Sequence, residues 1–189
     1  IEPTDSTADA AEALGIAVLR QFFSESLAKQ LVAEGKQADL ITGNNVYAHV
    51  PDINDFTQGL KTALKSSGTI TLEFPHLLNL IQLNQFDTIY HEHFSYLSLI
   101  TVSKIFSKHG LRIYDVEQLS THGGSLRVFG CHEESKHLQT ASVDRILKEE
   151  TKVGLTNIST YRQFQSRANV VKDDILDFLI QKKREGKKV

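Results

Sequence analysis

One short segment concentrates side chains that can move protons: Tyr90, His91, Glu92 and His93 follow one another. An imidazole titrates near neutral pH, so a histidine here can take a proton from a weakly acidic carbon or hydroxyl. A neighbouring carboxylate can orient the ring or raise its basicity. On a strand, His91 and His93 would share one face and Glu92 would lie on the other. The segment predicts a general base, and a hydrogen-bonded cluster without a catalytic role is the plainer alternative.

The same histidines allow a second reading, a metal-dependent hydrolase or lyase. His91 and His93 could bind a metal ion, but such a site needs at least one more ligand and nothing nearby fixes one; the hydrolase or lyase hypothesis uses His76 as the third residue. The single cysteine, Cys131, excludes a cysteine-only metal site and an internal disulfide framework. We expect Cys131 to be a small buried apolar side chain.

Further polar residues follow expected strands, where open α/β sheets bind their ligands. Asn44, Asn45 and His49 come after the apolar run 38–42. The asparagines could face a ligand or simply form the turn, because Asn tolerates a left-handed backbone. Glu2 stands where a strand is expected to end, the place of an acidic residue that accepts hydrogen bonds from ribose hydroxyls. An ordinary surface carboxylate is the alternative interpretation of Glu2.

A loop with two adjacent glycines, His122-Gly123-Gly124, lies between the last two expected strands. Paired glycines allow the backbone to approach a ligand closely, or they serve a tight turn. The loop is therefore a candidate ligand-binding element, with turn formation as the alternative.

Composition limits the class of protein. The chain has 189 residues, enough for one large domain or one domain with a small appendage, and its 21 Lys+Arg against 23 Asp+Glu leave a net charge of −2. This balance argues against a dedicated nucleic-acid binder. No stretch reaches the ~18 apolar residues of a membrane span, and the acidic start lacks the plan of a signal peptide. We therefore predict a cytoplasmic protein with no membrane partner.

The first ninety residues alternate between short apolar runs and amphipathic stretches. The apolar runs predict strands at 16–19, 38–42 and 69–74. Capping residues and helical spacing predict helices that start at Ser6 or Thr7 and end near Leu14, run from Ser24 to Gly35, and run from Asp52 to Leu64. This alternation is typical of βαβ units and of a parallel sheet covered on both faces.

The pattern changes after residue 100. The sequence predicts a helix over 101–109, strands over 111–119 and 126–131, and helices over 136–152 and 161–184. The two strands are joined without a helix and must be antiparallel or nearly so. The expected fold is α/β, with a mostly parallel sheet, an antiparallel terminal hairpin and a helical segment. A non-enzymatic helical interaction module over 133–189 is an alternative function.

Four segments occur in an order that resembles one enzyme family. They are Asn45–Pro51, Glu73–Leu77, Phe86–Tyr96 and His122–Arg127. The chain resembles the C-methyltransferases that use S-adenosylmethionine on nucleotide-linked keto-deoxysugars, and the Glu-His-Phe and His-Gly-Gly motifs are the specific part. The resemblance runs through the whole chain.

That resemblance implies a domain organisation. Residues 1–132 would be a Rossmann-like methyltransferase core that is incomplete at its N-terminus, and 133–189 a helical connector that leads to a C-terminal α/β domain. A zinc-binding domain and a glycine-rich cofactor loop would precede Ile1. The chain has no Met, which fits a piece of a longer protein. Alone, we expect it to be inactive and to bind the cofactor poorly.

The resemblance also implies roles for single residues. His93 is the general base, and the other groups around the reacting sugar are Tyr90, Glu92 and His49. The cofactor-binding positions are Glu2, Asn44 and Asn45. The substrate-binding positions are His76, His91, His122, Gly123 and Gly124. Members of the family often have Asp at the position of His91 and differ around Pro75-His76, so the sugar stays open and His91 is a second candidate base.

Overall fold

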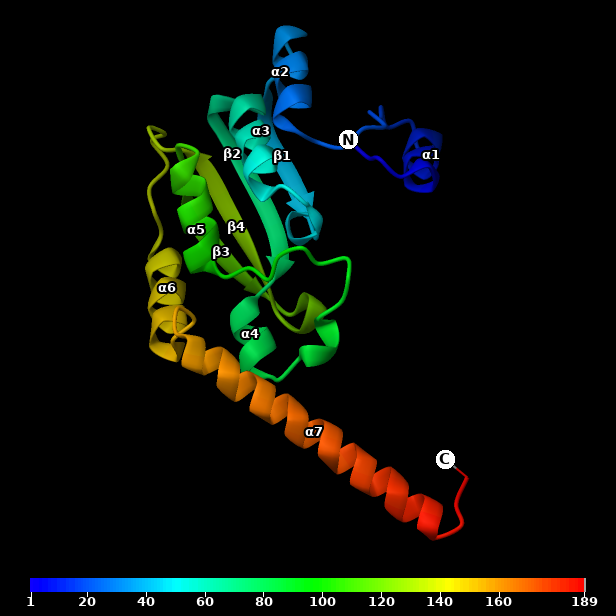
Figure 1. Ribbon diagram of the computed structural model, residues 1–189. Coiled ribbons are helices and arrows are strands. Elements are labelled where there is room, and N and C mark those ends of the chain that lie inside the picture. The colour runs from blue at the N-terminus through cyan, green and yellow to red at the C-terminus, as the bar shows by residue number, and fades with distance from the viewer. Residues whose placement is uncertain (189) are drawn as a thin grey trace.

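A computed structural model describes residues 1–188, and its centre is a four-stranded sheet (Figure 1). The strands are β1 (Ala38–Asn44), β2 (Leu64–Pro75), β3 (Leu111–Leu119) and β4 (Ser125–His132), in the order β1-β2-β4-β3. β1 runs parallel to β2, and β4 is antiparallel to both β2 and β3. Three of these strands therefore point the same way, and the predicted α/β class with an antiparallel hairpin is confirmed.

Helices precede, connect and follow the strands. They are α1 (Asp5–Ala13), α2 (Glu25–Ala33), α3 (Ile53–Ala63), α4 (Leu77–Gln82), α5 (Leu99–Lys108), α6 (Ala141–Val153) and α7 (Ile158–Arg184), with the 3₁₀ turns η1 (Tyr47–His49), η2 (Phe86–Thr88) and η3 (Thr121–Gly123). Side-chain caps fix several starts, since Ser24, Asp52 and Ser98 accept backbone N–H groups at the first turns of α2, α3 and α5.

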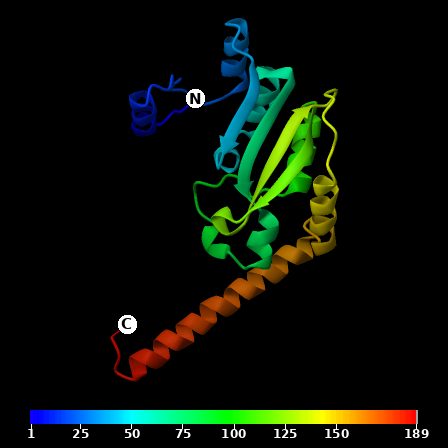
Figure 2. The same cartoon turned by 180° about the vertical axis from the view of Figure 1, so that it is seen from behind.

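The main core lies between the sheet and the helices α3 and α5, which Figures 1 and 2 show against the same face. On β2, the side chains of Ile70, Leu72 and Phe74 are fully buried, whereas Thr69 and Thr71 on the other face are partly exposed; Glu73 on that face is a buried exception. This period of two is that of a strand with one buried face. Within residues 1–188, the expected cover on both faces is therefore not found.

The strand predicted over 16–19 does not form. Ile16 and Leu19 are 56% and 38% exposed. The backbone contact of this stretch with residues 1–4 is a single hydrogen bond from Glu2 N to Leu19 O, and Glu2 is not in a strand either. An apolar run becomes a strand only when a neighbour pairs with its backbone groups. Here the adjoining edge of the sheet begins at Ala38 and pairs with β2 alone.

The two C-terminal helices differ in how they meet the sheet. Val143 and Ile146 of α6 are buried in the main core, so the segment after residue 133 does not fold apart from the sheet, as the interaction-module alternative would require. Helix α7 projects from the body, and it has no buried residue (Figures 1 and 2). A contact in its first half attaches it to the body, since the Arg167 side chain donates to Ile81 O.

Two smaller expectations concern burial and membranes. Cys131 is fully buried, and this burial raises the pKa of its thiol, as fits a structural residue. Among the helices of residues 1–188, none is both long enough and apolar enough to cross a membrane.

Candidate active site

The candidate site lies at the carboxyl ends of β1 and β2. Asn44 pairs in register with Glu73, and Asn45 N donates to Glu73 O at 2.9 Å. Asn45 has a φ of +53°, in the left-handed region that Asn tolerates. Both asparagine side chains are exposed at the end of the parallel pair. Open α/β sheets bind their ligands at this place.

The turn η1 after β1 holds the histidine segment, Tyr90–His93 and the residues that follow it, against this edge of the sheet. Ala48 O accepts hydrogen bonds from Phe94 N at 2.9 Å and Ser95 N at 3.2 Å. The turn is itself anchored, because Tyr47 is buried and its hydroxyl lies 2.7 Å from Thr57 Oγ1. These bonds bring together two residues that are distant in sequence.

His49 and His93 are those two residues, with ring centroids 4.8 Å apart. Tyr90 stacks obliquely on His93 at 4.5 Å, and its hydroxyl lies 3.4 Å from His93 Nε2. Tyr96 meets the same imidazole edge-on at 5.5 Å, and its hydroxyl accepts a hydrogen bond from Tyr90 N at 3.1 Å. His93 thus sits in a partly buried cage of rings that fixes its position.

The environment of the His93 ring lowers its pKa. Burial is the largest cause, because it disfavours the charged imidazolium, and the electrostatic effect of the neighbouring His49 acts in the same direction. His122 adds to the effect, while the Thr88 backbone and the Glu92 carboxylate oppose it. The lowered pKa keeps His93 neutral near pH 7, with a lone pair that can accept a proton.

Turn η3 carries His122 toward this site in a left-handed backbone conformation, with a φ of +53°. Two side chains hold the turn. Thr121 Oγ1 donates to Glu73 Oε1 at 2.8 Å, and Gln85 Nε2 donates to Gly123 O at 2.9 Å. The loop is therefore a built element fastened to β2 and to the segment after α4.

The two glycines of this loop are required by the backbone. Gly123 and Gly124 have φ values of +75° and +116°, and a Cβ on either would run into the side-chain amide of Gln85 or Asn79, respectively. The close approach predicted from the paired glycines is thus made to protein side chains. Whether the same backbone also meets a ligand stays a prediction.

We expect Gly124→Ala to lower the free energy of unfolding by about 1–3 kcal/mol, because it adds a strained φ and displaces Asn79. Gly35→Ala is the matched control, since Gly35 has a φ of +73° but no atom within 4 Å of the added methyl. It should lose only the backbone part, about 1 kcal/mol. Urea unfolding compares the two variants, and equal losses would show that Asn79 does not crowd the loop.

The other residues that the sequence predicted for the site are not all found beside His93. His91 and Glu92 are exposed beside the ring cage. His76 is only 1% exposed, and its Nε2 lies 2.8 Å from Glu150 Oε1, so its ring faces the interior. Within residues 1–188, no group of three His, Cys, Asp or Glu side chains could hold a metal ion. His76, His91 and His93 are therefore not brought together as metal ligands.

Glu2 lies in the segment before α1, on the side of the sheet where β1 is the edge strand (Figure 1). Its Oε1 accepts a hydrogen bond from Thr4 N at 2.7 Å, and this bond lowers the pKa of the Glu2 carboxyl. The hydrogen bond thus favours the ionised form of the Glu2 carboxyl, while its cofactor role stays a prediction.

Sequence patterns missed the acidic residue that organises the site. Glu73 is 7% exposed, and besides Thr121 it binds the Arg127 guanidinium, with Nη2 to Oε2 at 2.9 Å. A signal for it exists: Glu73 interrupts an otherwise apolar strand between Leu72 and Phe74. A buried carboxylate needs such partners.

Two solved structures have this arrangement of strands and helices. One is a methyltransferase from Thermotoga maritima described as a possible histamine N-methyltransferase, with a TM-score of 0.53 and 17% identity over 70% of this chain and 71% of that one. The other is a putative methyltransferase from Listeria monocytogenes, with a TM-score of 0.51 and 11% identity over 70% of this chain and 78% of that one. The fold is that of the S-adenosylmethionine-dependent methyltransferases.

Sequence comparison narrows the class. The family described as "Methyltransferase domain" matches residues 4–116, and the family described as "C-methyltransferase C-terminal domain" matches residues 120–189. The C-methyltransferase NovU of Streptomyces niveus is 33% identical over all 189 residues. The chain belongs to the methyltransferase-domain family, and its C-terminal part matches the C-methyltransferase C-terminal domain. It spans 45% of the length of that relative.

Proposed function

We propose that this chain carries the catalytic half of an enzyme that transfers a methyl group to a carbon of a nucleotide-linked keto-deoxysugar, with His93 as general base. One observation carries the proposal: a partly buried imidazole with a lowered pKa stands between His49 and Tyr90, at the ligand-binding edge of a methyltransferase sheet. A cytoplasmic setting and the domain division at residue 132 belong to the same proposal.

His93 acts on the carbon next to the ketone of the sugar. Its neutral imidazole takes a proton from that carbon, and the electron pair of the broken C–H bond forms an enolate whose charge rests on the carbonyl oxygen. Donors near that oxygen stabilise the enolate. The Tyr90 hydroxyl is one candidate donor. His49 is another, because its Nε2 is shielded from solvent and has no hydrogen-bond partner within residues 1–188.

The cofactor side is proposed for Asn44 and Asn45, with Glu2 on the ribose hydroxyls. Bound S-adenosylmethionine supplies a methyl group on a positively charged sulfur, which an enolate carbon can attack. The exposed amides at the end of β1 fit a polar ligand, as does the ionised carboxylate of Glu2. Holding donor and acceptor in line accounts for much of the rate gain in such reactions.

The substrate side is proposed for His91, His122, Gly123 and Gly124, with Glu92 beside the base. His122 is close enough to His93 to affect its pKa, which supports a place for the glycine loop at the sugar. His91 is the more exposed of the two candidate bases and lies outside the cage of rings. This difference favours His93 as the base.

A pH profile tests the proposal. We expect kcat/KM for methyl transfer in the complete protein to fall on acidification, because only neutral His93 accepts a proton. The midpoint should lie below 6.5, the usual imidazole value, since the pKa of His93 is lowered. His49→Asn removes the neighbouring imidazole that helps to lower the pKa of His93, so it should move the midpoint upward toward 6.5. Two results would count against His93 as the base: a midpoint above 6.5 in the wild type, or a midpoint that is the same in the wild type and in His49→Asn.

A further inference from the structure

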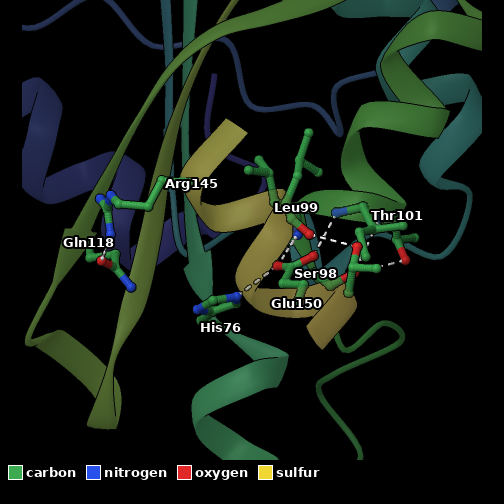
Figure 3. A network of polar contacts seen from close by, with 10 residues as sticks. His76, Ser98, Leu99, Thr101, Gln118, Arg145 and Glu150 are labelled. Carbon is green, nitrogen blue, oxygen red and sulfur yellow. Dashed lines mark hydrogen bonds and ion pairs between the residues drawn. The ribbon is translucent and has the colours of Figure 1, made fainter. Parts of the chain in front are cut away.

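A buried hydrogen bond joins Glu150 of α6 to His76, the residue before α4 (Figure 3). His76 Nε2 lies 2.8 Å from Glu150 Oε1, and both side chains are 0% exposed. The same Oε1 accepts Leu99 N at 2.6 Å, and Oε2 accepts Ile100 N at 2.8 Å. Because two backbone N–H groups already donate to Glu150, we assign the His76 proton to Nε2, so that three donors converge on this carboxyl group.

The positions of these donors matter more than their number. His76 is the last residue before α4, and Leu99 and Ile100 form the first turn of α5. The segment between α4 and α5 carries Tyr90 and His93. One carboxylate from α6 therefore holds both ends of the stretch that contains the proposed base.

The backbone reinforces this closure. His76 and Leu97 form a parallel β-bridge, and Leu77 N donates to Leu97 O at 2.9 Å. His76 N donates to Gly124 O at 3.0 Å, which ties the glycine loop to the same point. His76 thus sits where β2, the glycine loop and the exit of the histidine segment meet.

We propose that Glu150 and His76 are positioning residues for His93, and this rests on the proposed role of His93 as the base. Charge-assisted hydrogen bonds are short and directional, so they fix the geometry of the groups that they join. The helix dipole at the start of α5 adds to the attraction of its N–H groups for the carboxylate. Glu150 lies in the region matched by the C-methyltransferase C-terminal domain, so this region sets the position of a base that precedes it in sequence.

The test compares His76→Leu with His76→Gln in the complete protein. Leu removes the donor to Glu150, whereas the Gln amide can replace it. We expect His76→Leu to lower kcat about 10- to 100-fold, because a shift of about 1 Å in a reacting group has an effect of this order. The KM for S-adenosylmethionine should stay within about twofold, and His76→Gln should recover most of kcat.

Hydrogen exchange gives a second readout, which does not need methyl transfer. In deuterium oxide without cofactor, the rate at which the sugar loses its hydrogen to solvent reports the base alone, and His76→Leu should lower it in parallel with kcat. His132→Leu is the matched control, since His132 bonds Leu64 O at the opposite end of β4. Its kcat and exchange rate should equal the wild-type values.

Three outcomes would overturn the proposal. They are a wild-type kcat in His76→Leu, equal losses in His76→Leu and His76→Gln, and a KM for the cofactor that rises in step with the loss of kcat. If His76→Leu does not fold, Glu150→Gln takes its place. The Gln amide keeps one acceptor oxygen, and its NH₂ group faces the Ile100 N–H, so that hydrogen bond is lost. Unchanged hydrogen exchange of the sugar in this variant also refutes the proposal. Exchange that survives in His93→Gln refutes the proposed function instead, so the two failures are distinguishable.

Discussion

Replacing His93 with Gln should lower the rate of methyl transfer in the complete protein by about 10²- to 10⁴-fold, the contribution of a positioned general base. Glutamine nearly fills the same space beside Tyr90 and His49, but its amide cannot accept the proton. Initial rates with a labelled methyl donor measure the loss. Hydrogen exchange of the sugar in deuterium oxide should fall in parallel.

Two companion measurements make this result specific. The dissociation constant of S-adenosylmethionine, measured by calorimetry, should change less than about twofold, because the proposed cofactor residues lie at Asn44, Asn45 and Glu2. His91→Gln should keep hydrogen exchange at saturating sugar, since His91 lies outside the ring cage. If exchange is lost in His91→Gln and kept in His93→Gln, the base is His91.

Phe106→Ala should lower the free energy of unfolding by about 3–5 kcal/mol, the usual cost of removing a buried aromatic ring. Phe106 is 0% exposed on the inner face of α5, and its ring meets Tyr47 edge-on at a centroid distance of 6.4 Å. A Cβ on Gly130 of β4 would run into the same ring, so strand and helix are tightly packed there. Urea unfolding measures the change.

Phe22→Ala is the control for this loss, because Phe22 is 81% exposed. A surface substitution of this kind changes stability by about 0.5 kcal/mol or less. Similar losses in the two variants would mean that α5 is not packed on the sheet as described. The result bears on function, since α5 starts at the residues that Glu150 holds.

The candidate site is thus assembled from segments that are scattered along the chain. The end of β1 supplies the asparagines, η1 supplies His49, the stretch before α5 supplies Tyr90 and His93, and η3 supplies His122. Glu73 of β2 holds Thr121 of η3, and Glu150 of α6 holds Leu99 at the start of α5. Because such carboxylates are costly to bury without partners, their networks also make the arrangement specific.

Local patterns predicted most of the elements. The helix expected from Asp52 is present as α3, capped by that residue, and the strand expected over 111–119 is β3 with the same bounds. Amphipathic spacing and capping act within a few residues, so they can be read from the sequence alone. Strand β2 begins at Leu64, earlier than expected, because it continues without a loop from α3.

The sequence mispredicts secondary structure where contact with another part of the chain decides which element forms. Residues 16–19 have the apolar character of a strand, but no neighbouring strand pairs with them. Helix α4 was not predicted, and its residues Leu78, Leu80 and Ile81 are buried in a small second core against Leu155. Short apolar runs are compatible with helix or strand, and tertiary packing selects between them.

For the site, the sequence by itself determined the chemistry that is available: an imidazole beside a carboxylate and a tyrosine at 90–93, asparagines after a strand, and a glycine pair. Only the tertiary structure decided which imidazole lies in the ring cage, which is exposed, and which is buried against Glu150. The physical reason is that a pKa, a cage or an ion pair depends on distance and burial. These depend on contacts such as Ala48 with Phe94, which residue order does not reveal.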